Sequence, residues 1–162
     1  MHITLTRKDK TPYAIDGQIT IDGEHICDTA ECITAALPVG TYRVALIRCH
    51  QHGRKMPVII PMSEAASALR GADTHITPLL VARPKCASCK KLKCVSNNTP
   101  MPRYCPMIKP GNGVCNRQDG SIIVGERFVS GCLLHPVTHF NRLYERIRKS
   151  ASRGHDITLT IV

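Results

Sequence analysis

Five of the nine cysteines of the chain lie close together in the sequence: Cys86, Cys89, Cys94, Cys105 and Cys115. Two residues separate Cys86 from Cys89, a spacing that places both thiolates on one tight turn where they can share a metal ion. Cys94 and Cys105 supply the two further ligands of a tetrahedral set. The sequence therefore predicts a structural Zn²⁺ site formed by these four cysteines.

Other chemistry is open to the same region. Cys115 and Cys49 are candidates for an additional metal ligand or a disulfide partner. Disulfides are the main alternative if the protein reaches an oxidising compartment. An iron–sulfur cluster fits less well, because the spacing lacks the compact ferredoxin pattern. Cys27, Cys32 and Cys132 lie among apolar residues instead, which predicts small side chains of the core.

The charge of the chain, formally +10 at pH 7, is concentrated in two stretches. Residues 83–118 hold eight Lys and Arg and no Asp or Glu, and residues 142–153 hold five basic residues against one acidic. Such stretches attract nucleic acid, anionic glycan or an acidic protein partner, although a solvated basic surface without a dedicated partner has the same appearance. The anion-binding candidates in the cysteine-rich stretch are Lys90, Lys91, Lys93 and Arg103.

The elements that position these residues are predominantly strands. Asp22-Gly23 lies between two alternating runs, which is a strong hairpin pattern, and the alternating stretches "HITLT" and "DITLTIV" near the two ends of the sequence are similar enough to pair. Phe140, Leu143, Tyr144 and Ile147 recur at helical spacing, which predicts one amphipathic helix. We therefore expect a mostly β (α+β) fold.

The domain organisation follows from length and composition. A chain of 162 residues favours a single domain over 1–162, with residues 61–105 as a cysteine-rich basic loop inserted within it. No run is long and apolar enough to span a membrane. The stretch "MHITLTRK" lacks the parts of a signal peptide, so we expect synthesis in the cytoplasm. The scarcity of aromatic residues, four Tyr, two Phe and no Trp, argues against binding of single strands by base stacking.

Five motifs occur in the order found in a known family. They are "GQITIDGEHICDTAE" (17–31), "LPVGTYRV" (37–44), "IKPGN" (108–112), "GSIIVG" (120–125) and "FNRLYER" (140–146). In these motifs the chain resembles an uncharacterised bacterial and phage family, number 5675 among the domains of unknown function. The resemblance covers roughly residues 1–60 and 104–150, and it leaves out most of the cysteine-rich segment.

By analogy of motif shape, that family is similar to the L,D-transpeptidases, β-rich enzymes of peptidoglycan in which a Cys attacks a peptide carbonyl and a His acts as base. The resemblance implies a transpeptidase-like β-sandwich or barrel. This chain carries Lys109 at the family's His position and Ser121 at its Cys position. A Ser–Lys pair needs a desolvated amine, whereas the basic, largely polar surroundings of Lys109 predict an exposed one.

Three functional hypotheses follow. The favoured one is a non-catalytic, degenerate binding or structural module of a phage or bacterial assembly, in the virion or a phage-like particle, whose metal- or disulfide-tied loop contacts glycan, nucleic acid or another particle protein. The second is a peptidoglycan-active hydrolase or acyltransferase that uses Ser121 and Lys109. The third is a zinc-dependent nucleic-acid-binding protein. Whether the chain is an enzyme is left open, with the balance against it.

Overall fold

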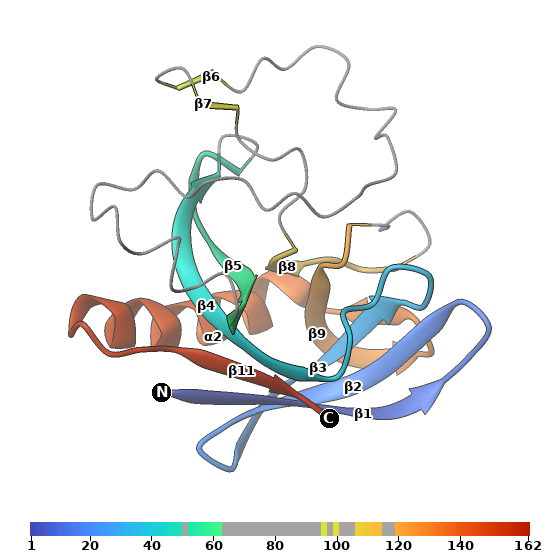
Figure 1. Ribbon diagram of the computed structural model, residues 1–162. Coiled ribbons are helices and arrows are strands. Elements are labelled where there is room, and N and C mark those ends of the chain that lie inside the picture. Colours follow the sequence, from blue (N-terminus) through green and yellow to red (C-terminus); the bar gives the residue numbers. More distant parts are fainter. Residues whose placement is uncertain (50–51, 63–94, 97–98, 101–105, 115–118) are drawn as a thin grey trace.

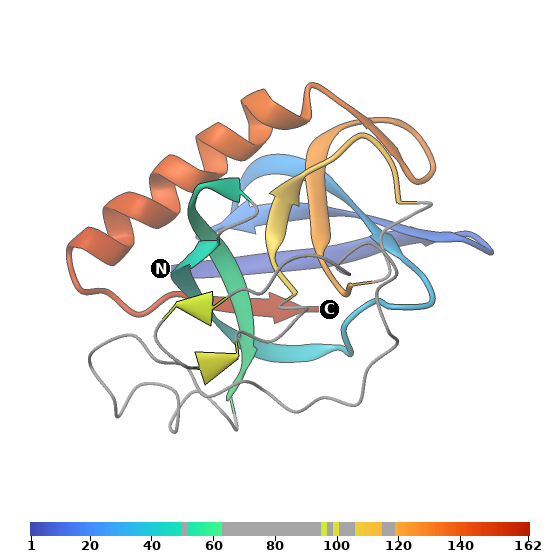
Figure 2. The ribbon, with the colours of Figure 1, turned by 90° about the horizontal axis from the view of Figure 1, so that it is seen from above.

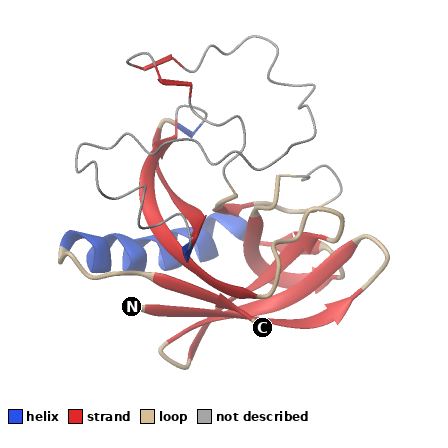
Figure 3. Cartoon of the chain, in the orientation of Figure 1, coloured by secondary structure: helices blue, strands red, loops and turns tan. Residues whose placement is uncertain are grey.

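The computed structural model describes residues 1–49, 52–62, 95–96, 99–100, 106–114 and 119–162. Its elements, in chain order, are β1 (His2–Lys10), β2 (Ala14–Ile21), β3 (Glu24–Cys32), β4 (Gly40–Cys49), β5 (Arg54–Pro61), β6 (Val95–Ser96), β7 (Thr99–Pro100), β8 (Ile108–Pro110), β9 (Ile122–Val129), β10 (Cys132–Leu134), α2 (Pro136–Ser152) and β11 (Thr158–Ile161). Strands dominate and the long helix α2 precedes the last strand, as Figure 3 shows, so the predicted mostly β fold with one amphipathic helix near the C-terminal end is confirmed.

One sheet forms the body of the molecule, and it curls into a nearly closed barrel (Figure 1). The strand order is β10-β9-β3-β2-β1-β11-β4-β5, and β8 pairs in parallel with β9. The sheet closes where β8 meets β5, through a bridge between Val58 and Met107 and a hydrogen bond of 2.8 Å from the Ile59 N–H to the Pro106 carbonyl. A segment of a few residues therefore joins the two ends of the sheet.

Two local predictions about strand pairing are confirmed. Asp22 and Gly23 both have positive φ, 50° and 89°, as a tight two-residue hairpin turn requires, and they join β2 to β3. The strands nearest the two ends of the chain also pair, because β1 and β11 run parallel with His2 opposite Thr158. β11 thereby lies between β1 and β4 in the sheet.

The main core fills the barrel, and α2 lies along one side of it (Figure 2). Alternate residues of the strands point inward, as Ile3 and Leu5 do on β1, both fully buried. From the helix, Phe140, Leu143 and Ile147 join the same core, and each such burial stabilises the fold by about 1.5–3 kcal/mol. The predicted helical spacing therefore identified the buried face of α2 correctly.

A second, smaller apolar cluster lies on the other face of β9. Ile122 and Val124 belong to the main core, whereas Ile123 between them points the opposite way. The members of this outer cluster are Ala14, Ala30, Val114, Ile123 and Leu133, with Cys32 packed against them. The first half of β9 is consequently buried on both faces.

A hydrogen-bonded ion pair ties β1 to β3. The Arg7 guanidinium donates two hydrogen bonds of 2.8 Å to the two carboxylate oxygens of Glu31 and a third to the Leu37 carbonyl. Glu31 is almost fully buried, and the hydrogen bond with its carboxylate raises the pKa of Arg7 despite the opposing effect of burial. A buried ion pair is tolerated when such bonds replace lost hydration, so Glu31 of the first family-like motif has a structural role.

Gly17 offers a direct test of the packing between β1 and β2. A Cβ at this position would lie 2.6 Å from the Thr6 carbonyl oxygen and 3.0 Å from the Thr29 hydroxyl. We predict that Gly17→Ala destabilises the protein by about 1–3 kcal/mol, measured by urea unfolding. Gly113→Ala is the control, because its Cβ would come no nearer than 3.7 Å to the Gly131 carbonyl. Equal stability of the two variants would contradict the close packing.

Candidate functional site

The structure brings Lys109 and Ser121 to adjacent strand positions. Lys109 is on β8 and Ser121 directly precedes β9, and the register places Lys109 opposite Ile123. Side chains alternate along a strand, so Lys109, Ser121 and Ile123 point to the face that carries the outer cluster, away from the main core. The two residues singled out by the family resemblance therefore share one local environment.

Both side chains are buried. Lys109 is 5% exposed and Ser121 is 2% exposed. The expectation of a solvent-exposed Lys109, drawn from the basic composition around it, is wrong. Composition averages over both faces of the chain, whereas Lys109 points to the face of β8 on which Ile123 and the outer cluster lie.

The Lys109 amine forms an ion pair with the carboxylate of Asp119, whose side chain is 22% exposed. The second oxygen of that carboxylate accepts a hydrogen bond of 3.0 Å from the Ser121 backbone N–H. Burial alone would raise the pKa of Asp119. The hydrogen bond and charge of Lys109, together with the bonds from Ser121, outweigh burial and lower that pKa below 3.8. Asp119 is therefore held as a carboxylate.

The Ser121 hydroxyl completes the pairing of β8 with β9. Its Oγ accepts a hydrogen bond of 3.2 Å from the Met107 N–H, while the neighbouring Ile122 N–H donates to the Met107 carbonyl at 3.0 Å. Met107 is the residue that bridges to β5. A hydroxyl is a better acceptor than a thiol sulfur, so a serine at position 121 suits this structural bond.

This arrangement is not that of a hydroxyl activated by an amine. Within the described residues, no hydrogen bond joins the Lys109 Nζ to the Ser121 Oγ, and the amine is paired with the Asp119 carboxylate instead. An ammonium paired with a carboxylate has no free lone pair with which to take a proton from a hydroxyl. What the geometry supplies is a buried charge pair that anchors the turn before β9.

Asp119 is the residue of this cluster that sequence reasoning missed. It stands in the "QDG" turn, where Gly120 has a positive φ of 72°. An Asp before such a Gly is typical of turns, so its residue type gave no separate indication that it pairs with a lysine. The pairing of β8 with β9 could have indicated this role. Once the two strands are adjacent, the charged side chain of Lys109 needs a carboxylate nearby.

The remaining described cysteines differ from one another. Cys27 is fully buried as predicted, and burial, helped by the charge of Asp28, raises the pKa of its thiol to about 12. A thiol of that pKa is a poor nucleophile at neutral pH. Cys32 is half-buried against the outer cluster. The prediction that Cys132 is a core residue is wrong, because it is exposed on β10.

The predicted metal site and its basic residues lie outside the described residues. These positions are Cys86, Cys89, Cys94, Cys105, Cys115, Lys90, Lys91, Lys93 and Arg103. Cys49, at the end of β4, is described and half-buried. Among the described side chains, no group of three or more His, Cys, Asp or Glu is arranged to hold a metal ion. The Zn²⁺ site therefore stays a prediction.

Comparison with known proteins adds no relative. No protein-family model, no curated protein and no solved structure matches the chain. Within the described part, no helix is of the length and apolarity needed to cross a membrane. The resemblance to the uncharacterised family, and its similarity to L,D-transpeptidases, accordingly stay predictions.

Removal of the carboxylate partner should be costly. Asp119→Asn leaves the buried Lys109 ammonium without its counter-charge, and we predict a loss of about 2–4 kcal/mol in the free energy of unfolding. Lys109→Met combined with Asp119→Asn should recover most of that loss, because no charge is then buried. Asp156→Asn is the control: its ion pair with the half-buried Arg43 is open to solvent, because Asp156 is 79% exposed, and the change should cost less than about 1 kcal/mol.

The same pair predicts a dependence on pH. Because the folded pKa of Asp119 lies below its unfolded value of 3.8, its stabilising contribution is fully present above about pH 4 and is lost as the pH falls through the folded pKa. The difference in unfolding free energy between the wild type and Asp119→Asn should therefore shrink in acid. A difference that stays constant from neutral pH to below pH 3 would contradict the assigned pair.

Proposed function

We propose that the protein is a non-catalytic binding or structural module of a phage or bacterial assembly. The observation that carries this proposal is the engagement of both candidate catalytic groups in structural bonds. The Lys109 ammonium is neutralised by Asp119, and the Ser121 Oγ accepts the Met107 N–H. Both groups are then used to hold β8 in the barrel, which favours a scaffold over a reactive site.

The partner contact in this proposal falls to the cysteine-rich basic segment, residues 61–105. A long loop of this composition needs a tether, which Zn²⁺ or disulfides would supply, and its lysines suit an anionic partner. Cell-wall glycan, nucleic acid and another particle protein are the partner classes. In this proposal the β barrel is the rigid support, and the segment is inserted in the chain between β5 and β8.

One observation favours the alternative of a Ser–Lys hydrolase or acyltransferase. Lys109 is buried beside Ser121, and desolvation is the condition under which a lysine amine can serve as base. The alternative requires Asp119 to move away from the amine and the Ser121 hydroxyl to leave the Met107 N–H. Each change gives up a bond that holds β8 to β9, which is why the non-catalytic role is preferred.

A turnover assay separates the two. Purified wild-type protein, incubated with a peptidoglycan stem peptide and analysed by mass spectrometry, should release no product and form no acyl adduct. Ser121→Ala should behave identically and keep most of the stability, because the change removes one hydrogen bond worth about 1 kcal/mol. Turnover by the wild type that disappears in Ser121→Ala would establish the enzyme and end the non-catalytic proposal.

The tether is tested by intact mass and metal content of protein purified without reductant. The expected result is about one zinc per chain. A chelator should remove this zinc and make the cysteine thiols reactive. A mass lower by about 2 Da for each bond formed, without metal, would replace zinc by disulfides. Free thiols throughout and no metal would remove the tethered segment from the proposal.

A further inference from the structure

The hairpin of β4 and β5 extends beyond the barrel. β11 pairs with β4 only from Gly40 to Arg43, and β8 reaches β5 at Val58 and Ile59. Beyond these points, residues 46–49 and 54–57 pair with one another and, within the described part, with no other strand. We call these residues the β4–β5 arm. Figure 1 shows the arm rising from the barrel as a twisted two-stranded ribbon.

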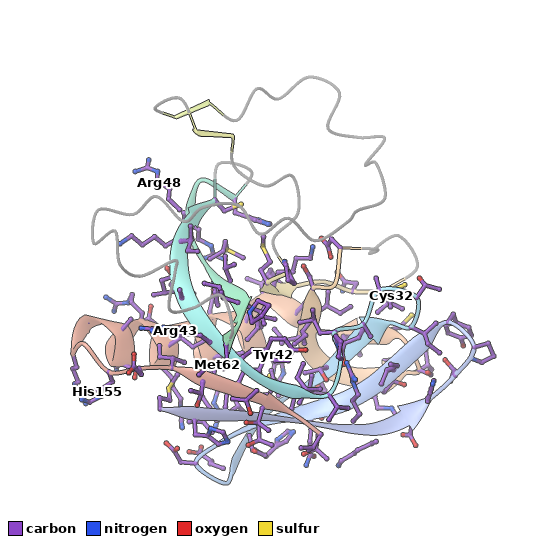
Figure 4. The ribbon with its side chains drawn as sticks, in the orientation of Figure 1. Cys32, Tyr42, Arg43, Arg48, Met62 and His155 are labelled. Carbon is purple, nitrogen blue, oxygen red and sulfur yellow. The ribbon has the colours of Figure 1, made fainter. Side chains whose placement is uncertain are left out.

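The arm is basic and carries no acidic residue. Arg48, Arg54 and Lys55 are all exposed near its end, and residues 32–62 contain no Asp or Glu. Arg48 and Lys55 are opposite each other in the register, so their side chains share one face of the ribbon. Among the described residues, no carboxylate pairs with any of the three. In Figure 4 the Arg48 side chain projects outward from the arm.

Stacking on the helix fixes the arm beside a second basic segment. The Arg54 guanidinium lies 4.9 Å from the centre of the Phe140 ring and 5.4 Å from that of Tyr144, two rings of α2 that stack on each other. Such cation–π contacts leave the N–H groups at the rim of the guanidinium available for a further acceptor.

We propose that the β4–β5 arm binds the phosphate backbone of double-stranded nucleic acid. A two-stranded ribbon has the width that the major groove of B-form DNA admits, and arginine forks match phosphate oxygens bidentately. The few aromatic residues of the chain argue for a duplex over single strands, because base stacking needs rings. The assignment goes beyond the loop contact of the proposed function and does not depend on the cysteine-rich segment.

The test uses the full chain and a fluorescent duplex DNA of mixed sequence, with binding followed by anisotropy over a range of salt. Three phosphate contacts from Arg48, Arg54 and Lys55 predict a slope of about −2.7 for log K against log salt. Arg48→Gln with Lys55→Gln should weaken binding and reduce the slope by about two. Both side chains are exposed, so the fold should be unchanged, as checked by circular dichroism and the unfolding midpoint.

A matched control separates the arm from overall charge. Lys8→Gln with Lys10→Gln removes the same charge from exposed residues of β1, which ends on the other side of the barrel from the arm (Figure 1). Little loss in this control, beside a clear loss in the arm variant, supports the proposal. Equal losses in both variants would overturn it in favour of unspecific attraction to the net charge of +10.

Two further outcomes would also overturn the nucleic-acid assignment. One is the absence of duplex binding by the wild type. The other is binding to a sulfated glycan or an acidic protein surface that depends on the arm, without binding to the duplex. That result would show that the arm binds another class of partner. The stem-peptide assay measures turnover and not binding to DNA. If the nucleic-acid proposal fails, the non-catalytic role is therefore still tested by its own experiment.

Discussion

The barrel depends on the short segment from Pro106 to Pro110, which closes the sheet between β5 and β9. Its backbone is engaged on both sides: the Pro106 carbonyl accepts the Ile59 N–H, and the Met107 carbonyl accepts the Ile122 N–H. β5 is joined to β9 only while this closure holds, and without it this end of the sheet would be open. The residues that stabilise the segment are therefore constrained by the fold before any chemistry is considered.

That constraint explains the character of the candidate site. Ser121 satisfies the Met107 N–H, and Asp119 both accepts the Ser121 N–H and neutralises Lys109. Each polar group of the cluster thus has a partner, as buried polar groups generally require. The sequence suggested Lys109 and Ser121 as a catalytic pair. In the structure, the two residues belong with Asp119 to a small hydrogen-bonded network that fixes the start of β9.

The local fold could be predicted from the sequence wherever a residue pattern is compatible with only one local structure. Asp22-Gly23 admits few conformations other than a tight hairpin, and the spacing of Phe140, Leu143 and Ile147 defines one face of a helix. The site could not be predicted to the same depth. Burial of Lys109 and its pairing with Asp119 depend on β8 lying beside β9, a contact that neither local propensity nor charge counting contains. Cys132 shows the same limit, because its apolar neighbours Leu133 and Leu134 do not reveal which way it faces.

The position of β11 has a consequence for how the protein is made. It separates β1 from β4, and its contacts with β1, such as the one from His2 to Thr158, join residues 156 positions apart. The β2–β3 hairpin can form as soon as it leaves the ribosome, but β1 and β4 have no common neighbour until residues 158–161 have been synthesised. The barrel consequently assembles late, and a chain released before this strand would expose the flanks of β1 and β4 to aggregation.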